Sequence, residues 1–326
     1  MSGIKTSGEK TLMLFSGRAN PELADEIARE LETEVSPTDV REFPNGEIYT
    51  RPQESVRGCD AFVIQCLGAP INQWIMEQLI MVDALKRASA KRITVVMPFY
   101  PYARQDKKHL GREPITARLM ADLFNVAGAD RLMSVDLHTA QIQGFFDGPV
   151  DHLFAMPLLA SYICSKYPAE EFTVVSPDTG RVRMAERWSD RLGGTPVAFV
   201  HKTRDPRVAN QVVANRVVGD VSGRRCLLID DMIATGGTIV KAVDVLLDAG
   251  ATDVVVAATH AEFSEPAVDR LKNSRVSEVV VTNTLPLGDE KRFDKLTVLS
   301  IAPLIARAIR EIFDDGSVTS LFDGNA

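Results

Sequence analysis

The segment Cys226–Ile239, CLLIDDMIATGGTI, places two carboxylates beside a glycine-containing turn. An apolar run ends in Asp230 and Asp231, and the chain then passes through TGGT into a helical pattern. Glycines let backbone N–H groups converge on an anion, and the start of a helix adds the positive end of its dipole. The segment therefore predicts a phosphate-binding turn directly after a buried strand.

Two acids next to such a turn would repel a ligand that is only a phosphate. They fit a ligand with vicinal hydroxyls next to its phosphate, such as ribose 5-phosphate, because carboxylates accept hydrogen bonds from hydroxyls. The alternative is an acidic strand end followed by a plain glycine turn, which is common in α/β folds. The spacing excludes a nucleotide-binding P-loop, since GIKTSGEKT places its lysine one residue late, and no GxGxxG follows a strand.

Short apolar runs alternate with helical patterns along nearly the whole chain. Buried strands are indicated by TLMLFSG, AFVIQCLG, RITVVMP and FTVVSPD, and helices by PELADEIARELE and IVKAVDVLLDAGA. This alternation predicts an α/β fold with doubly wound, mainly parallel sheets that are covered on both faces. Ligands of such sheets bind beyond the carboxyl ends of the strands, so the polar residues after each strand are the candidates for chemistry.

The sequence also repeats itself. VDALKRASAKRITVV matches VDVLLDAGATDVVVA at six of 15 positions, and MPLLASYI is similar to APLIARAI further along the chain. One such match could arise by chance between helix–strand units, but two in the same order favour duplication of an α/β domain. We expect one domain over residues 1–150 and a second over 151–326, with a C-terminal helix at about 302–313 that packs on the first domain.

Composition excludes several classes of protein. The chain has 326 residues, with 37 Lys and Arg against 44 Asp and Glu, and a formal net charge of −7. This balance argues against a nucleic-acid-binding protein, which needs a broad basic face. No apolar run approaches the ~20 residues of a membrane helix, and MSGIKTSGEK lacks an apolar core, so we expect a cytoplasmic protein without membrane contact. The four cysteines lack CxxC spacing and histidine partners, which predicts reduced thiols rather than a zinc site.

The least regular stretch is HKTRDPRVANQ, residues 201–211, which is charged and interrupted by Pro206. It follows the apolar run VAFV and predicts an exposed, mobile loop. Taken alone, its Lys202 and Arg204 are interpreted as solvated surface charges.

The DD…TGGT turn resembles the phosphoribosyl-pyrophosphate-binding motif of the type I phosphoribosyltransferase fold. Similarity to the ribose-phosphate pyrophosphokinase family is carried by four further segments: REFPNGEIYTRPQESVRGCD, MPFYPYARQDKK, VDLHTAQIQGFFD and VVSPDTG. It extends from about Leu12 to Leu304, and the YARQD and DLHTAQIQGFF strings are very specific to that family. The tandem α/β domains of the family agree with the internal repeat.

The resemblance implies a Mg²⁺-dependent enzyme that transfers the diphosphoryl group of ATP to the C1 hydroxyl of ribose 5-phosphate, giving 5-phosphoribosyl 1-pyrophosphate and AMP. It also implies a homo-oligomer, expected to be a hexamer, with ATP sites shared between subunits, phosphate activation and ADP inhibition. The matching positions are Asn45, Gly46, Glu47, Arg104, Gln105 and Asp106 for ATP, His138 and Asp178 for Mg²⁺, Lys202 and Arg204 for catalysis, and Arg204, Asp230, Asp231, Ala234, Thr235, Gly236, Gly237 and Thr238 for ribose 5-phosphate.

Three positions depart from the family's pattern. Asn45 stands where the family usually has Asp, Ala234 replaces a frequent acid, and Arg181 occupies a position that is often glycine. Two alternatives stay open: a non-catalytic regulatory homologue, which the change at Ala234 would allow, and a phosphoribosyltransferase, which would lack the ARQD and DLH elements. Without the resemblance, His138 would be interpreted as a hydrogen-bonding histidine at a strand end, because imidazole is an unusual Mg²⁺ ligand.

Overall fold

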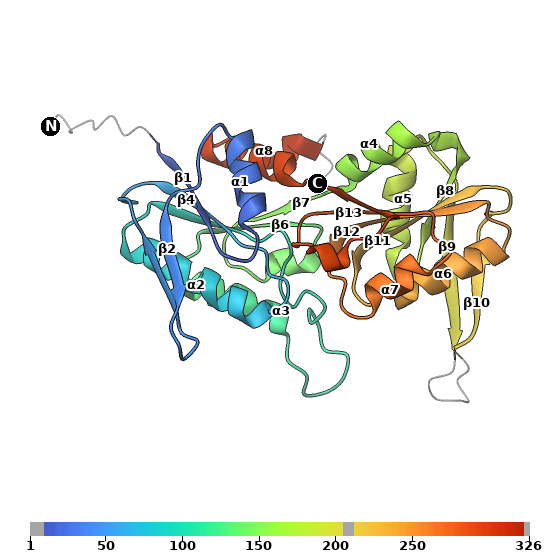
Figure 1. Cartoon of the computed structure of the whole chain (residues 1–326), viewed down its shortest axis with the longest axis horizontal. Helices are drawn as coiled ribbons and strands as arrows, with labels where there is room; N and C mark the ends of the chain where they lie inside the picture. Colours follow the sequence, from blue (N-terminus) through green and yellow to red (C-terminus); the bar gives the residue numbers. More distant parts are fainter. Residues whose placement is uncertain (1–9, 205–211, 323–326) are drawn as a thin grey trace. The chain divides into compact units, whose positions relative to one another are not determined.

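Figure 1 presents the computed structural model of the chain, which describes residues 10–204 and 212–322. The described residues form two compact units. The first ends at Leu153 and also takes in the chain from Ala302 onward, and the second is Phe154–Ile301. Within the described ranges, no helix is long and apolar enough to cross a membrane.

The first unit is built on a sheet of five parallel strands in the order β1-β4-β5-β6-β7. All five residues of β4 are buried, as expected for a parallel strand with both faces covered. The strands are β1 (Leu12–Ser16), β4 (Asp60–Ile64), β5 (Arg92–Val96), β6 (Arg131–Val135) and β7 (Val150–Leu153). The strand β7 completes this sheet, and the continuous part of the unit ends with it at Leu153.

The chain reverses its winding direction at β1. Leu14 pairs with Phe62 of β4 on one side and forms a parallel bridge to Val35 on the other. In Figure 1, α1 and α8 accordingly lie on one face of the sheet and α2 and α3 on the other. The helices of the unit are α1 (Pro21–Glu30), α2 (Ile71–Arg87), α3 (Thr116–Ala127) and α8 (Ala302–Phe313), with short 3-10 turns η1 (Ala140–Gly144) and η5 (Val318–Phe322). The unit is therefore doubly wound, with its switch point between β1 and β4.

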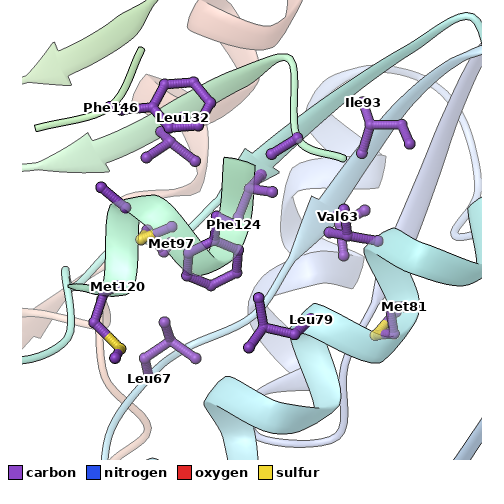
Figure 2. Packing of buried hydrophobic residues seen from close by; sticks show 14 of the residues in the cluster. Val63, Leu67, Leu79, Met81, Ile93, Met97, Met120, Phe124, Leu132 and Phe146 are labelled. Atoms are coloured by element: carbon purple, nitrogen blue, oxygen red, sulfur yellow. The ribbon is translucent and has the colours of Figure 1, made fainter. Parts of the chain in front are cut away.

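The apolar core of the first unit lies between the sheet and the helices α2 and α3. Figure 2 shows Phe124 of α3 beside Met97, which follows β5, with Leu79 and Met81 of α2 close to Val63 of β4. Phe124, Val63 and Met97 are completely buried. This packing fixes the strand ends, and with them the loops that carry the polar residues of the predicted site.

A separate antiparallel hairpin branches from the first unit. It is formed by β2 (Thr38–Glu42) and β3 (Ile48–Pro52), joined by a turn over residues 43–47. The Phe43 N–H donates to the Glu47 carbonyl and the Gly46 N–H donates to the Phe43 carbonyl, each at 2.8 Å. Gly46 takes a φ of 87°, which glycine adopts without steric cost.

The second unit contains a seven-stranded sheet in the order β10-β9-β8-β11-β12-β13-β14. All neighbours are parallel except β9 and β10. The strands are β8 (Phe172–Ser176), β9 (Val197–Arg204), β10 (Val212–Val218), β11 (Arg225–Ile233), β12 (Asp253–Ala261), β13 (Glu278–Thr282) and β14 (Leu296–Leu299). The chain moves outward from β8 to β9 and β10 and then returns to β11 on the other side of β8. This places the switch point of the unit between β8 and β11.

The helices of the second unit are α4 (Met156–Lys166), α5 (Val182–Arg191), α6 (Gly237–Asp248) and α7 (Ala267–Lys272), with 3-10 turns η2 (Ala169–Glu171), η3 (Thr179–Arg181) and η4 (Asp289–Lys291). The sequence repeat corresponds to equivalent elements, because its first segment covers α2 and β5 and its second covers α6 and β12. The similar MPLLASYI and APLIARAI segments form α4 and α8. Helix α4 packs against α5, and α8 packs against α1, the first helix of its own unit.

One expectation about the chain after VAFV needs correction. The segment from residue 201 was expected to be a loop, but β9 continues to Arg204, which pairs with Val212 of β10. The antiparallel partner strand extends β9 beyond its apolar part, because backbone pairing needs no apolar side chains. Residues 205–211 of the expected loop lie outside the described residues.

Candidate active site

The acidic pair lies at the switch point of the second unit. β11 pairs with β8 only as far as Leu228, while its pairing with β12 continues to Ile233. Asp230 and Asp231 therefore lie beyond the end of β8, where a doubly wound sheet forms its ligand-binding crevice. Asp231 is only 2% exposed, and its backbone N–H donates to Asp230 Oδ1 at 2.9 Å.

Arg181 reaches the acidic pair from the loop after β8. Its Nη2 donates to Asp231 Oδ1 at 2.8 Å, and its Nε lies 3.7 Å from Asp230 Oδ1. One guanidinium group thus lies against both carboxylates and joins the two sides of the switch point. The ion pair is mostly shielded from water, since the Arg181 side chain is 19% exposed.

The two carboxylates are electrostatically coupled. Burial raises the pKa of Asp230 well above its usual range, and the negative charge of Asp231 raises it further. The guanidinium of Arg181 acts in the opposite direction and lowers that pKa. Arg181 therefore favours the ionised form of a carboxylate that its surroundings otherwise drive toward protonation.

The TGGT turn carries the chain from β11 into α6. Gly236 takes a left-handed φ of 71° and caps the helix, with Val240 N–H donating to its carbonyl at 3.0 Å. Arg270 of α7 supports the turn by donating from Nη1 to the carbonyl of Thr235 at 3.0 Å. The first turn of α6 presents backbone N–H groups, which suit a phosphate at a helix N-terminus. The hydroxyls of Thr235 and Thr238 are on exposed residues of the same turn.

Asp178 lies in the loop between β8 and η3. Its carboxylate accepts a hydrogen bond from the Gly180 N–H at 2.8 Å, and its carbonyl accepts one from Ser176 Oγ at 2.5 Å. These contacts fix a half-buried carboxylate just beyond the end of β8, the strand that neighbours β11. The structure thus brings Asp178, Arg181 and the acidic pair to the same end of one sheet.

In the first unit, the loops after β5 and β6 are joined through Asp106. This carboxylate is only 5% exposed and accepts from Thr139 Oγ1 at 2.8 Å and from Gln141 Nε2 at 2.7 Å. Its neighbour Gln105 accepts from Thr116 Oγ1 at the start of α3. The side chains of Gln105 and Asp106 are therefore hydrogen-bonded within the protein, and Arg104 is an exposed residue beside them.

His138 is half-buried in the loop after β6, next to the Thr139 contact. The preceding Leu137 N–H donates to His152 Nε2 at 2.9 Å, so the loop is also fixed to the end of β7. Two independent hydrogen bonds on either side of His138 hold its backbone in place.

Asn45, Gly46 and Glu47 form the exposed tip of the β2–β3 hairpin. Asn45 Oδ1 accepts from the Glu47 N–H at 3.2 Å, which stabilises the turn. Figure 1 shows this hairpin apart from the long loop that joins β5 to α3.

The crevice between β1 and β4 in the first unit is occupied by the chain's own polar side chains. Glu77, which is fully buried, accepts from Arg18 Nε at 2.7 Å and from Gln65 Nε2 at 2.9 Å. These contacts join the ends of β1 and β4 to α2.

The side chains of Lys202 and Arg204 lie outside the described residues, although both positions belong to β9. Among the side chains that the structure describes, no group of three or more His, Cys, Asp or Glu residues is arranged to hold a metal ion.

Comparison with known proteins identifies relatives along the whole chain. Residues 12–128 match the N-terminal domain of ribose phosphate pyrophosphokinase, and residues 201–323 match the phosphoribosyl synthetase-associated domain. The ribose-phosphate pyrophosphokinase of Mycobacterium tuberculosis (strain ATCC 25618 / H37Rv) is 66% identical over 326 residues, or 100% of both chains. The chain belongs to the ribose-phosphate pyrophosphokinase family.

Other members of the family agree with this result. The ribose-phosphate pyrophosphokinase of Streptomyces coelicolor is 67% identical over 323 residues, which is 99% of each chain. The crystal structure of phosphoribosylpyrophosphate synthetase from Mycobacterium smegmatis has a TM-score of 0.90 at 63% identity, and the match covers 94% of this chain and 100% of that one. The family and the α/β fold with mainly parallel sheets, both predicted from the sequence, are confirmed.

Some contacts of the site were not predicted from the sequence. Arg181 was noted as a departure from the family's glycine, but its ion pair with Asp231 depends on the strand order, which brings β8 beside β11. The hydrogen bonds of Asp106 to Thr139 and Gln141 likewise need the pairing of β5 with β6. The available signal was the position of these residues at or beyond the carboxyl ends of strands.

Proposed function

We propose that the chain is a ribose-phosphate diphosphokinase, which converts ATP and ribose 5-phosphate to 5-phosphoribosyl 1-pyrophosphate and AMP. The observation that carries the proposal is the coupled pair Asp230 and Asp231 directly before a phosphate-binding turn, in a chain of this family. The C1 hydroxyl oxygen forms a bond to the β-phosphorus of ATP, and the bond from that phosphorus to the α,β-bridging oxygen breaks. AMP leaves with the bridging oxygen, and the hydroxyl proton is released.

The second unit binds ribose 5-phosphate in this proposal. The 5-phosphate occupies the N-terminus of α6, where Thr235, Gly236, Gly237 and Thr238 supply backbone N–H groups and hydroxyls. Asp230 and Asp231 accept hydrogen bonds from the ribose hydroxyls. Ala234 contributes only backbone to this turn, so no general base is assigned there. The arrangement orients the C1 hydroxyl for an in-line attack, which is the main requirement of phosphoryl-type transfer.

The first unit binds ATP through the loop of Arg104, Gln105 and Asp106. Arg104 is exposed and able to bind phosphate through its guanidinium fork, while buried Asp106 holds the loop. Asn45, Gly46 and Glu47, at the exposed tip of the hairpin, reach the nucleotide of a neighbouring subunit, as the resemblance to the family implies. The proposal therefore requires a homo-oligomer, and we expect a hexamer in the cytoplasm.

His138 and Asp178 are the proposed protein ligands of two Mg²⁺ ions. A single side chain for each ion suits Mg²⁺, which keeps several waters and binds mainly through substrate phosphates. The half-buried carboxylate of Asp178 is a hard oxygen donor of the kind that Mg²⁺ prefers. When bound, Mg²⁺ would neutralise charge on the transferring oxygens.

Lys202 and Arg204 are the proposed catalytic cations, and Arg204 also contacts the sugar phosphate. Two cations near the β-phosphoryl oxygens stabilise the negative charge that develops as the diphosphoryl group moves. Their position at the end of β9, next to β8 in the sheet, supports a role on the ribose side of the reaction.

The test is an assay for AMP formed from ATP and Mg²⁺, with and without ribose 5-phosphate. The proposal expects AMP only when the sugar phosphate is present. Absence of AMP from protein that binds both substrates would contradict the proposal and favour a non-catalytic regulatory homologue, for which Ala234 is the motivating change. Consumption of phosphoribosyl pyrophosphate with a nucleobase would instead favour a phosphoribosyltransferase.

A further inference from the structure

Arg181 is bound to both carboxylates of the acidic pair. Its side chain crosses from the end of β8 to the end of β11 and donates to Asp231 at 2.8 Å, with Asp230 at 3.7 Å. The side chain is 19% exposed and the Asp231 side chain 2% exposed, so little water screens this interaction. A shielded arginine between two acids is a more constrained arrangement than a surface ion pair.

The acidic pair needs a nearby positive charge for two reasons. Adjacent carboxylates repel each other, and together they repel an anionic sugar phosphate that approaches the TGGT turn. The Arg181 guanidinium offsets this charge and also fixes the direction of an Asp231 oxygen. With Arg181 present, the carboxylates remain hydrogen-bond acceptors. The net negative charge near the TGGT turn is smaller, so a phosphate group is repelled less.

We propose that Arg181 is a positioning residue for the sugar-phosphate substrate, which balances the charge of Asp230 and Asp231 and orients them to accept the ribose hydroxyls. This inference rests on the proposed function of the same site. Arg181 acts through the carboxylates in this scheme and makes no contact with the phosphate. Arg270, by contrast, supports the phosphate turn through the Thr235 carbonyl. The two arginines therefore have separable roles.

The experiment measures binding of ribose 5-phosphate and of inorganic phosphate, without ATP, by titration calorimetry. The variants are Arg181→Ala and Arg181→Lys, and the control is Arg183→Ala, which removes an exposed arginine two residues away. We expect Arg181→Ala to raise the Kd for ribose 5-phosphate about tenfold, the scale of a lost charged hydrogen bond. The Kd for inorganic phosphate should rise by a smaller factor, because phosphate is repelled by the acidic pair but makes no hydrogen bond to it. Arg181→Lys should recover most of the affinity, and the control should match the unchanged chain.

Two further readouts separate positioning from general damage. In the AMP assay, Arg181→Ala should raise the KM for ribose 5-phosphate and change kcat less than about threefold. The lost interaction stabilises the bound substrate and the transition state equally, so the barrier between them stays the same. The increase in KM that Arg181→Ala causes should be smaller for 2-deoxyribose 5-phosphate, because this sugar has one hydroxyl fewer to donate to Asp230 and Asp231.

Three results would overturn the inference. These are an unchanged Kd for ribose 5-phosphate in Arg181→Ala, an equal loss of phosphate binding, or a loss in Arg181→Lys as large as in Arg181→Ala. If Arg181→Ala does not fold, Arg181→Gln takes its place in the titrations with both ligands, because glutamine removes the charge with a side chain closer in size to arginine. Failure of the proposed function is seen separately, as absence of AMP from the unchanged protein, whereas the binding titrations do not depend on turnover.

Discussion

The Thr139 hydroxyl donates a hydrogen bond of 2.8 Å to Asp106 Oδ2 and thereby joins the loop after β6 to the loop after β5. Gln141 donates to the same oxygen at 2.7 Å. Asp106 belongs to the ARQD string, and Thr139 directly follows His138, so this buried carboxylate links the proposed nucleotide loop to a proposed metal ligand. In the described structure, the role of Asp106 is to hold these loops together.

Replacement of Asp106 by alanine should therefore weaken the use of ATP. Two donors would lose their buried acceptor, and the loops on either side would lose their fixed relation. We expect kcat/KM for ATP to fall about 100-fold, on the scale of a misplaced substrate-binding group, with the Kd for ribose 5-phosphate unchanged. Asp83→Ala, which removes an exposed carboxylate paired with Arg87, is the matched control. Normal ATP kinetics in Asp106→Ala would contradict a linking role.

Lys202 provides a test of transition-state stabilisation. If its ammonium group stabilises charge on the diphosphoryl oxygens, Lys202→Ala should lower kcat by about 100-fold or more, the scale of losing one such donor. The KM for ribose 5-phosphate should change much less, because the loss is confined to the transition state. Lys241→Ala, at an exposed position of α6, serves as the control. Near-normal turnover of Lys202→Ala would remove Lys202 from the mechanism.

The sequence predicted the fold class, the family and the turn after β11 because these depend on local patterns. Apolar runs indicate strands, and the TGGT segment indicates the start of a helix. Both can be recognised without knowing which distant residues are neighbours in the fold. The ion pair of Arg181 with Asp231 and the contact of Thr139 with Asp106 depend on which strands are neighbours. Strand order is a property of the whole sheet, so no local pattern reveals it. For the same reason the sequence did not predict that β9 continues past its apolar residues, because this extension depends on pairing with β10.

Gly236 allows a test in which backbone strain and ligand binding are separated. Its φ of 71° disfavours any side chain by ~1–2 kcal/mol, although a Cβ would meet the backbone of Ala267 only at an ordinary 3.5 Å. Gly193 has a φ of 84° with no atom within 4 Å of its would-be Cβ, and it lies outside the turn. Gly236→Ala and Gly193→Ala should lose similar amounts of thermal stability. Only Gly236→Ala should also lose ribose 5-phosphate affinity, and equal affinities in the two variants would contradict the proposed phosphate site.

The cysteines should differ sharply in reactivity. Burial raises the pKa of Cys66 and of Cys226 to about 12, and that of Cys59 to about 11, whereas Cys164 is exposed on α4. Since the thiolate is the reactive form, a disulfide reagent should label one thiol per native chain and four after denaturation. Cys164→Ser should abolish native labelling. Rapid native labelling of more than one thiol would show that the buried cysteines are accessible in solution.

Glu278 at the start of β13 should make the stability of the second unit depend on pH. Its buried carboxylate accepts from Tyr162, Tyr167 and Thr297 at 2.7 Å each, and Lys166 lies at 2.9 Å. Burial raises the pKa of Glu278, but these hydrogen bonds and the lysine lower it by more, so the net shift is downward. The ionised group therefore contributes stability that is fully present above its unfolded pKa of about 4.3 and is lost as the pH falls through the lower folded value.

Glu278→Gln removes this charge and turns an amide N–H toward a group of donors. We expect a loss of about 1–3 kcal/mol in the free energy of unfolding at pH 7, the range for an unsatisfied buried polar network. The difference between variant and unchanged protein should shrink below about pH 4, where the native carboxylate also becomes protonated. Asp248→Asn, which breaks an exposed pair with Arg275, should cost less than about 1 kcal/mol at either pH. Denaturant unfolding at the two pH values measures these differences, and a Glu278→Gln loss that persists undiminished at low pH would assign the effect to packing instead of charge.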